Sequence, residues 1–166
     1  MQSHTLEYLV EATPEKIWAT LHPPHQHARE GPRVIEYAGG RIEIIQEGDE
    51  TGKGLVRHCT FRVPKWLLSG GVGRSWECVT ESRVNEYSHY MAVGKPLWSR
   101  AEGWYELTAV EGGNTRLVFG ETYEAFNPIL RKTLEGPVHR AISRDNDQFF
   151  RQAVERCGAV TLVAHP

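Results

Sequence analysis

The chain has 166 residues, of which 40% are hydrophobic and 24% are charged, and this composition excludes intrinsic disorder, collagen-like repeats and low complexity. Lys and Arg number 19 against 21 Asp and Glu, so the formal net charge is -2 and the basic excess of a nucleic-acid binder is missing. At roughly 150 residues per domain, this length predicts a single domain. We expect that domain to span residues 1–158, followed by a C-terminal tail at 159–166.

The cysteines and the apolar runs indicate the compartment. Cys59, Cys78 and Cys157 are far apart in the sequence and fit no Cys-x-x-Cys spacing, which is typical of a reducing environment. The opening MQSHTLEYLVEAT lacks a positive region followed by an apolar one, so it predicts no secretory signal. The longest apolar run is far short of the ~18 residues of a membrane span. We therefore expect a cytoplasmic protein without stable membrane insertion.

The first elements are a strand and a helix. Residues 5–12 (TLEYLVEA) alternate between a more apolar and a more polar set, which predicts a half-buried strand. Thr13 and Pro14 suit the N-cap and first position of a helix, because a proline there loses no helical hydrogen bond. The helix should end at His22-Pro23-Pro24, where the two prolines cannot continue it.

Six further strand signals follow, separated by short Gly-, Asn- or Pro-containing turns. They cover approximately residues 41–47, 54–63, 75–84, 86–94, 98–109 and 115–126. Links this short join antiparallel neighbours, since parallel strands need crossovers of a dozen or more residues. For the last hairpin, a three-residue loop places Tyr105 opposite Phe119 and a two-residue loop places it opposite Gly120. We prefer the first, because it keeps Leu107 beside Leu117.

Up to residue 127 apolar residues tend to alternate with polar ones, and after it they recur every three or four positions. Residues 128–157 therefore predict one long amphipathic helix, with a kink at Gly136-Pro137 and an end near Gly158. A sheet with one apolar face needs a partner layer, and this helix is the largest apolar helix in the chain. The predicted class is α+β, with a curved antiparallel sheet wrapped around the C-terminal helix.

This order of elements resembles the helix-grip fold of the START and polyketide-cyclase superfamily, which includes the birch-pollen-allergen relatives. The resembling segments are residues 6–21, 75–82, 104–119 and 128–157. The resemblance implies a seven-stranded antiparallel sheet, short helices after the first strand, and an internal cavity for lipids, polyketides or similar apolar molecules. It implies no universal catalytic signature, and we expect no cofactor and no metal.

Side chains on the more apolar face of each strand are the candidate cavity lining. Residues on one side of the predicted helix over 128–157 complete the lining. The predicted ligand-binding residues are Tyr8, Arg57, Phe61, Trp76, Met91, Tyr105, Phe119, Tyr123, Val138, Ile142 and Asp145. Polar members of such a set must pair, meet water or meet a ligand, because an unpaired buried charge costs several kcal/mol. His89 and Glu121, if adjacent, form a candidate acid/base pair. The alternatives are ordinary buried polar pairs, a face assignment shifted by one residue, and an Asp145 that faces water.

Two further segments are open to interpretation. His22, His25 and His27 could bind a metal, but two prolines prevent a helix from aligning them, and we favour a surface loop. The apolar, Gly-rich segment 64–73 contains Trp66, Leu67 and Leu68. It is predicted to be either a cavity lid or a contact surface, including that of a homodimer.

Three functions fit these features. The first is a binder of a hydrophobic or amphipathic small molecule in a cavity between sheet and C-terminal helix. The second is a metal-independent enzyme of cyclase, dehydratase or hydrolase type that uses His89 or Glu121 to move a proton. The third is a protein-interaction module that acts through the 64–73 loop.

Overall fold

The computed structural model describes residues 2–22, 33–37, 40–63, 65, 70–95, 98–125, 128–133 and 135–164. The strands are β1 (Gln2–Val10), β2 (Arg33–Tyr37), β3 (Gly40–Gln46), β4 (Val56–Arg62), β5 (Val72–Arg83), β6 (Tyr87–Lys95), β7 (Trp98–Val110), β8 (Asn114–Ala125) and β9 (Val160–Ala164). The helices are α1 (Pro14–Leu21), α2 (Pro128–Thr133) and α3 (Glu135–Glu155), and a short 3-10 turn (Glu111–Gly113) joins β7 to β8.

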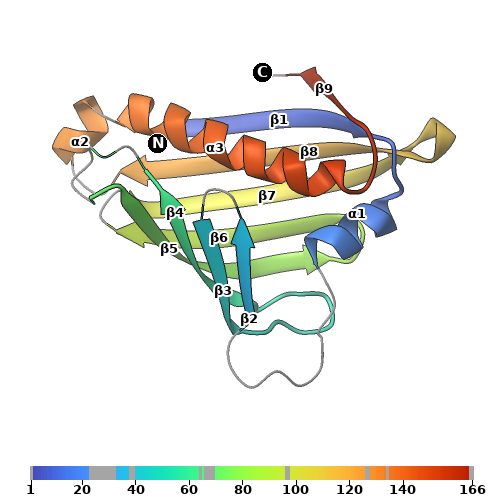
Figure 1. The fold of residues 1–166 in the computed structure, drawn as a ribbon, viewed down its shortest axis with the longest axis horizontal. Coiled ribbons are helices and arrows are strands. Elements are labelled where there is room, and N and C mark those ends of the chain that lie inside the picture. Colours follow the sequence, from blue (N-terminus) through green and yellow to red (C-terminus); the bar gives the residue numbers. More distant parts are fainter. Residues whose placement is uncertain are drawn as a thin grey trace.

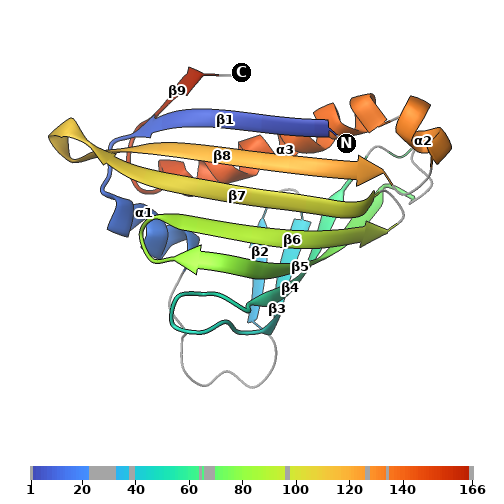
Figure 2. The ribbon, with the colours of Figure 1, turned by 180° about the vertical axis from the view of Figure 1, so that it is seen from behind.

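The strands form one antiparallel sheet in the order β2-β3-β4-β5-β6-β7-β8-β1-β9. The helices lie on one face of this curved sheet, with α3 running along the strands (Figure 1). Seen from behind, the opposite face carries none of the helices formed by the described residues (Figure 2). The class is therefore α+β with a curved antiparallel sheet, as the sequence predicts, but with nine strands instead of seven.

The two additional strands lie at the sheet margins. β2 pairs with β3, and β9 pairs with β1 through contacts such as Tyr8 with Leu162. The segment expected to be a tail thus adds a strand to β1. The physical reason is that β1 would otherwise be an edge strand with a row of unpaired backbone groups.

The expected helix over 128–157 is seen as α2 and α3 on the two sides of residue 134, which lies outside the described residues. Pro137 is the third residue of α3, where its missing N–H costs no intrahelical hydrogen bond. It therefore does not need to kink the helix. Gly158 follows α3 and lies against β1's end, since a Cβ there would sit 2.2 Å from the Glu11 carbonyl oxygen. None of the helices in the described ranges is both long and apolar enough to cross a bilayer.

The main apolar core lies at the α1 end of the sheet. Its largest buried members are Leu6, Tyr8, Ile17, Trp18, Tyr105, Leu107, Leu117, Phe119 and Phe150. The rings of Phe119 and Phe150 stack at 4.5 Å and join β8 to α3. The register of the last hairpin places Tyr105 opposite Phe119, so the three-residue loop is confirmed.

The predicted inner faces of β5 and β6 are wrong. Trp76 and Met91, expected inside, are 52% and 39% exposed, and Thr80 and Val93 share their outer face. The inner face of β5 carries Ser75, because Ser75 pairs with the buried Cys59 of β4. Here the outward set is the more apolar one, so the usual assignment of the apolar set to the interior fails.

Candidate functional site

A connected group of polar side chains lies on the inner face of the middle strands. We call it the polar belt; it consists of Arg57, Ser75, Glu77, Tyr90, Glu121 and Tyr123. The register explains how it forms. Arg57 pairs with Glu77 across β4 and β5, and Tyr90, Gly103 and Glu121 form one row across β6, β7 and β8.

At the β4 end of the belt, Arg57 and Glu77 form an ion pair. Arg57 Nε donates to Glu77 Oε2 at 2.6 Å, and Ser75 Oγ donates to Glu77 Oε1 at 2.8 Å. Burial by itself lowers the pKa of Arg57, but the attraction of the Glu77 carboxylate outweighs it, and the net pKa is raised. The arginine therefore remains a cation, and its guanidinium carbon lies 5.1 Å from the centre of the Tyr90 ring.

At the β8 end, Glu121 accepts hydrogen bonds from two phenols. Tyr90 donates to Oε1 at 3.2 Å and Tyr123 donates to Oε2 at 2.7 Å, while Glu121 is only 2% exposed. Gly103 makes the first contact sterically feasible. A Cβ at position 103 would lie 2.2 Å from the Tyr90 ring, so a glycine is what lets this ring cross β7 to reach Glu121.

The two phenols are held in their protonated form. Burial raises the pKa of both Tyr90 and Tyr123 well above the ordinary value, and the neighbouring Glu121 carboxylate raises it further. A protonated phenol can donate a hydrogen bond, so both tyrosines serve as fixed donors inside the protein.

Helix α3 adds a histidine to the β8 end of the belt. The His139 ring lies edge-on to Tyr123 with centroids 5.1 Å apart, and its Nε2 lies 3.4 Å from Ser143 Oγ. His4 of β1, opposite Glu121 in the register, approaches the same ring. Burial and the proximity of His4 lower the pKa of His139, so the imidazole is neutral at pH 7.

A second polar contact involves the predicted ligand residue Tyr105. Its hydroxyl lies 3.0 Å from His22 Nδ1, and the His22 ring stacks on Trp18 at 4.0 Å. Burial lowers the pKa of His22 to about 4. His25 and His27 lie outside the described residues. Within the described part of the chain, no three His, Cys, Asp or Glu side chains are grouped as a metal site would require.

The remaining predicted ligand-binding and lid residues lie outside the polar belt or outside the described residues. Tyr8 is buried and donates a hydrogen bond to Asp147 of α3, and Phe119 belongs to the main core. Phe61 packs beside Cys59 and Val63, next to the polar belt. The side chains of Val138, Ile142 and Asp145, and the predicted lid residues Trp66, Leu67 and Leu68, lie outside the described residues.

The expected acid/base pair is not formed, because His89 and Glu121 lie on opposite faces of the sheet. His89 Nδ1 is 2.6 Å from Thr80 Oγ1, and its Nε2 is 3.7 Å from Glu102 on the outer face. Sequence reasoning missed Glu77 and Tyr90, which take the inner positions instead. The signal that could have found Glu77 is its charge, since an inward Arg57 needs a carboxylate on a neighbouring strand.

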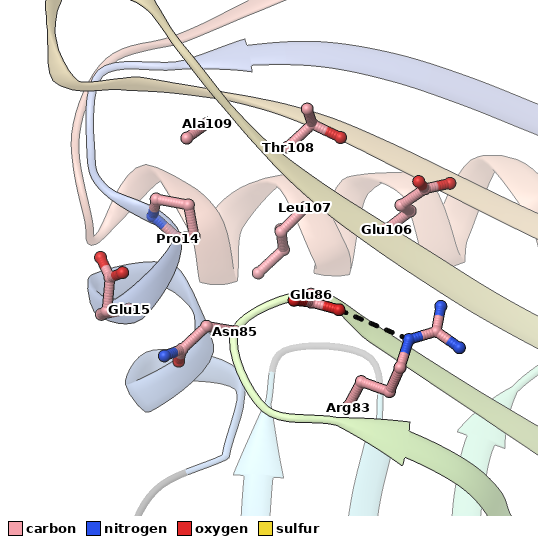
Figure 3. A pocket seen from close by; sticks show the side chains of 9 residues that line it. All are labelled: Pro14, Glu15, Arg83, Asn85, Glu86, Glu106, Leu107, Thr108 and Ala109. Carbon is pink, nitrogen blue, oxygen red and sulfur yellow. Dashed lines mark ion pairs between the residues drawn. The ribbon is translucent and has the colours of Figure 1, made fainter.

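A surface hollow of about 360 Å³ lies apart from the belt, between the start of α1 and the β5–β6 turn. Pro14, Glu86 and Leu107 are among its lining residues, and Arg83 pairs with Glu86 at 3.5 Å on its rim (Figure 3). This hollow is open to solvent and is distinct from the internal cavity expected between sheet and helix.

No model of a known protein family matches the sequence, and no curated protein is significantly similar to it. Solved structures do match. A START superfamily protein from Mycobacterium smegmatis is 14% identical, with a TM-score of 0.61 over 93% of this chain and 97% of that one. The ZhuI aromatase/cyclase from Streptomyces sp. R1128 is 17% identical, with a TM-score of 0.55 over 95% and 98%. Ara h 8.0201 is 16% identical, with a TM-score of 0.55 over 93% and 96%.

These similarities define the fold. The protein has the helix-grip fold shared by START proteins, Bet v 1-like proteins and aromatase/cyclases. At these identities the resemblance is one of architecture, and function has to be argued from the side chains of this chain.

Proposed function

We propose that the protein binds an amphipathic small molecule between α3 and the inner face of β4–β8, with the polar end of the molecule at Arg57. One observation carries the proposal. The Arg57 side chain points to the inner face and pairs with Glu77, yet it is 28% exposed. A cation on the inner face that still reaches solvent supports a hollow beside it.

The surroundings of Arg57 suit the apolar part of such a molecule. Beside the ion pair lie Phe61, Ala92, Ala101 and the Tyr123 ring, which form a cluster separate from the main core. Ala92 and Ala101 occupy the same cross-strand row as Glu77 and Tyr123. Small side chains between polar ones leave room above the middle of the sheet, and apolar walls with a few convergent polar groups are typical of ligand sites.

The chemistry of the belt favours an acceptor group on the ligand. Arg57 uses Nε for Glu77, and within the described residues no hydrogen bond involves its two terminal nitrogens. A guanidinium presents these donors as a planar fork, which suits a carboxylate, sulfonate or carbonyl oxygen. The hydroxyls of Tyr90 and Tyr123 already donate to Glu121, so these two side chains line the site and stabilise the belt.

A pair of dyes that differ in one charged group tests this assignment. Anilinonaphthalene sulfonate is anionic, and phenylnaphthylamine is its uncharged counterpart. In the double variant Arg57→Gln/Glu77→Gln, which keeps two hydrogen-bonding side chains but removes both charges, the Kd for the anionic dye should rise about 10-fold or more. The Kd for the neutral dye should change little.

The matched control is Arg116→Gln/Glu7→Gln, which removes an arginine–glutamate ion pair from the outer face. It should leave the binding of both dyes unchanged. Failure of the wild type to bind either dye, or equal weakening of both dyes in the Arg57/Glu77 variant, would contradict the proposal.

A proton-transfer enzyme of the cyclase or dehydratase type is the second candidate, now without His89. The observation that favours it is the buried Glu121 carboxylate between two protonated phenols, an arrangement with one proton acceptor and two donors. Under this alternative, Glu121→Gln cuts turnover of a ketone substrate at least ~10²-fold and leaves its binding intact. The third alternative, an interaction through segment 64–73, stays a prediction, because most of that segment lies outside the described residues.

A further inference from the structure

The outer face of β4–β6 carries an unusual combination of exposed apolar and basic side chains. We define the outer patch as Arg62, Val72, Arg74, Trp76, Met91 and Val93. Trp76 and Val93 are each 52% exposed, and they face each other across β5 and β6. Solvent-facing sides of antiparallel sheets are ordinarily polar, so exposed apolar side chains that lie side by side indicate a contact surface.

The patch is ordered in rows along the strands. Arg62 pairs with Val72 where β4 ends and β5 begins, and Arg74 is the next residue of β5 on the same face. Beyond them come the row of Trp76 and Val93 and then the row of Cys78 and Met91. None of the helices in the described part of the chain lies over this face in the view from behind (Figure 2). The two arginines therefore lie at one end of the patch, and its apolar side chains lie next to them on the same face of the sheet.

The cations of the patch are available for an external anion. Arg62 and Arg74 are exposed, and within the described residues neither forms an ion pair. Of the carboxylates that border the patch, Glu102 is neutralised by Arg100 and also faces His89. Glu43 of β3 lies opposite His58 of β4. Free cations beside an exposed tryptophan are the side-chain types that bind an anionic membrane surface, where tryptophan favours the headgroup region.

We propose that the outer patch docks the protein peripherally on membranes that contain anionic lipids. The apolar side chains of the patch, with Trp76 the largest, contact the interfacial region of the membrane. The two arginines contact the anionic headgroups. This role goes beyond small-molecule binding and does not depend on it, since the patch and the polar belt lie on opposite faces of the sheet.

Vesicle flotation tests the proposal with the full chain. The probes are vesicles of phosphatidylcholine and vesicles that also contain about 30 mol% phosphatidylserine. The wild type should float with the anionic vesicles only, and an increase in NaCl from about 0.05 to 0.5 M should release it, because salt screens exposed charges. Arg62→Gln/Arg74→Gln should lower the partition coefficient about 30-fold, at roughly 10^0.75 per cation. Trp76→Ser should lower it about 10-fold.

The control variant Lys16→Gln/Arg156→Gln makes the same change in net charge with exposed residues on the helix side of the molecule. It should bind like the wild type. Equal loss of binding in the control, equal flotation with neutral vesicles, or no flotation at all would overturn the proposal. So would concentration-dependent dimerisation in sedimentation velocity that Trp76→Ser abolishes while vesicle binding is absent, since the patch would then be an interface between copies. The dye assay stays separate, because none of these variants touches Arg57 or Glu77.

Discussion

The hydrogen bond from Tyr123 to Glu121 offers a quantitative test of the polar belt. Tyr123→Phe removes only the phenol oxygen, which lies 2.7 Å from Glu121 Oε2, and both residues are less than a tenth exposed. A hydrogen bond to a charged group contributes about 1.5–3 kcal/mol net, so the free energy of unfolding should fall by about 2 kcal/mol. That fall corresponds to a change of about 30-fold in the ratio of folded to unfolded protein.

Urea denaturation at neutral pH, followed by tryptophan fluorescence and circular dichroism, measures this loss. Tyr90→Phe is the matched comparison, and it should cost less because the Tyr90 bond to Glu121 is longer, at 3.2 Å. A double-mutant cycle of Tyr123→Phe with Glu121→Gln should give a coupling free energy of about 1 kcal/mol or more. A loss under about 0.5 kcal/mol at an unchanged m-value would refute the view that this contact is a buried, charge-assisted bond.

Three further predictions concern pH and packing. Burial raises the pKa of the belt tyrosines, so stability is intact below about pH 10 and falls above it as the unfolded chain ionises first, by about 1.4 kcal/mol per pH unit for each such tyrosine; a flat urea midpoint from pH 9 to about 11 would contradict this. The His22 pKa of about 4, against 6.5 unfolded, makes its contribution complete above pH 6.5 and lost as the pH falls toward 4. His22→Phe, which keeps a ring for stacking, should therefore reduce the acid loss of stability by about 3 kcal/mol, and an unchanged acid slope would count against it. In thermal melts, Gly103→Ala should displace the Tyr90 ring and lower the free energy of unfolding by about 1–3 kcal/mol, whereas Gly136→Ala, with open space around its Cβ, should leave it unchanged.

Local sequence signals are sufficient for much of the fold. The alternation in β1, the Pro14 start of α1 and the short turns predict an antiparallel sheet with the correct order of elements, because each depends on neighbouring residues only. The hairpin register between Tyr105 and Phe119 follows from keeping apolar pairs together. β2 and β9 were missed because short marginal strands depend on a partner edge, which no local pattern specifies.

The candidate site was predicted in part. Arg57, Glu121 and Tyr123 are inward and belong to one belt, because the inner faces of β4 and β8 follow the apolar pattern. His89 is excluded from it by the reversed faces of β5 and β6. Glu77 and Tyr90 complete the belt. An inward Arg57 calls for a nearby carboxylate, but which strand supplies it, and that Tyr90 lies in the row of Glu121, follows only from the register of the assembled sheet.

Periodicity in this chain specifies which side chains share a face, because successive residues of a strand point to opposite sides whatever the rest of the protein does. Which of the two faces becomes the interior was decided by the assembled sheet. In β5 the serine and glutamate turn inward and Trp76 turns outward, because the register with β4 brings Glu77 beside Arg57, where an inward charge finds its partner. That pairing depends on residues that are distant in sequence, so the alternation within β5 alone does not reveal which set of side chains is buried.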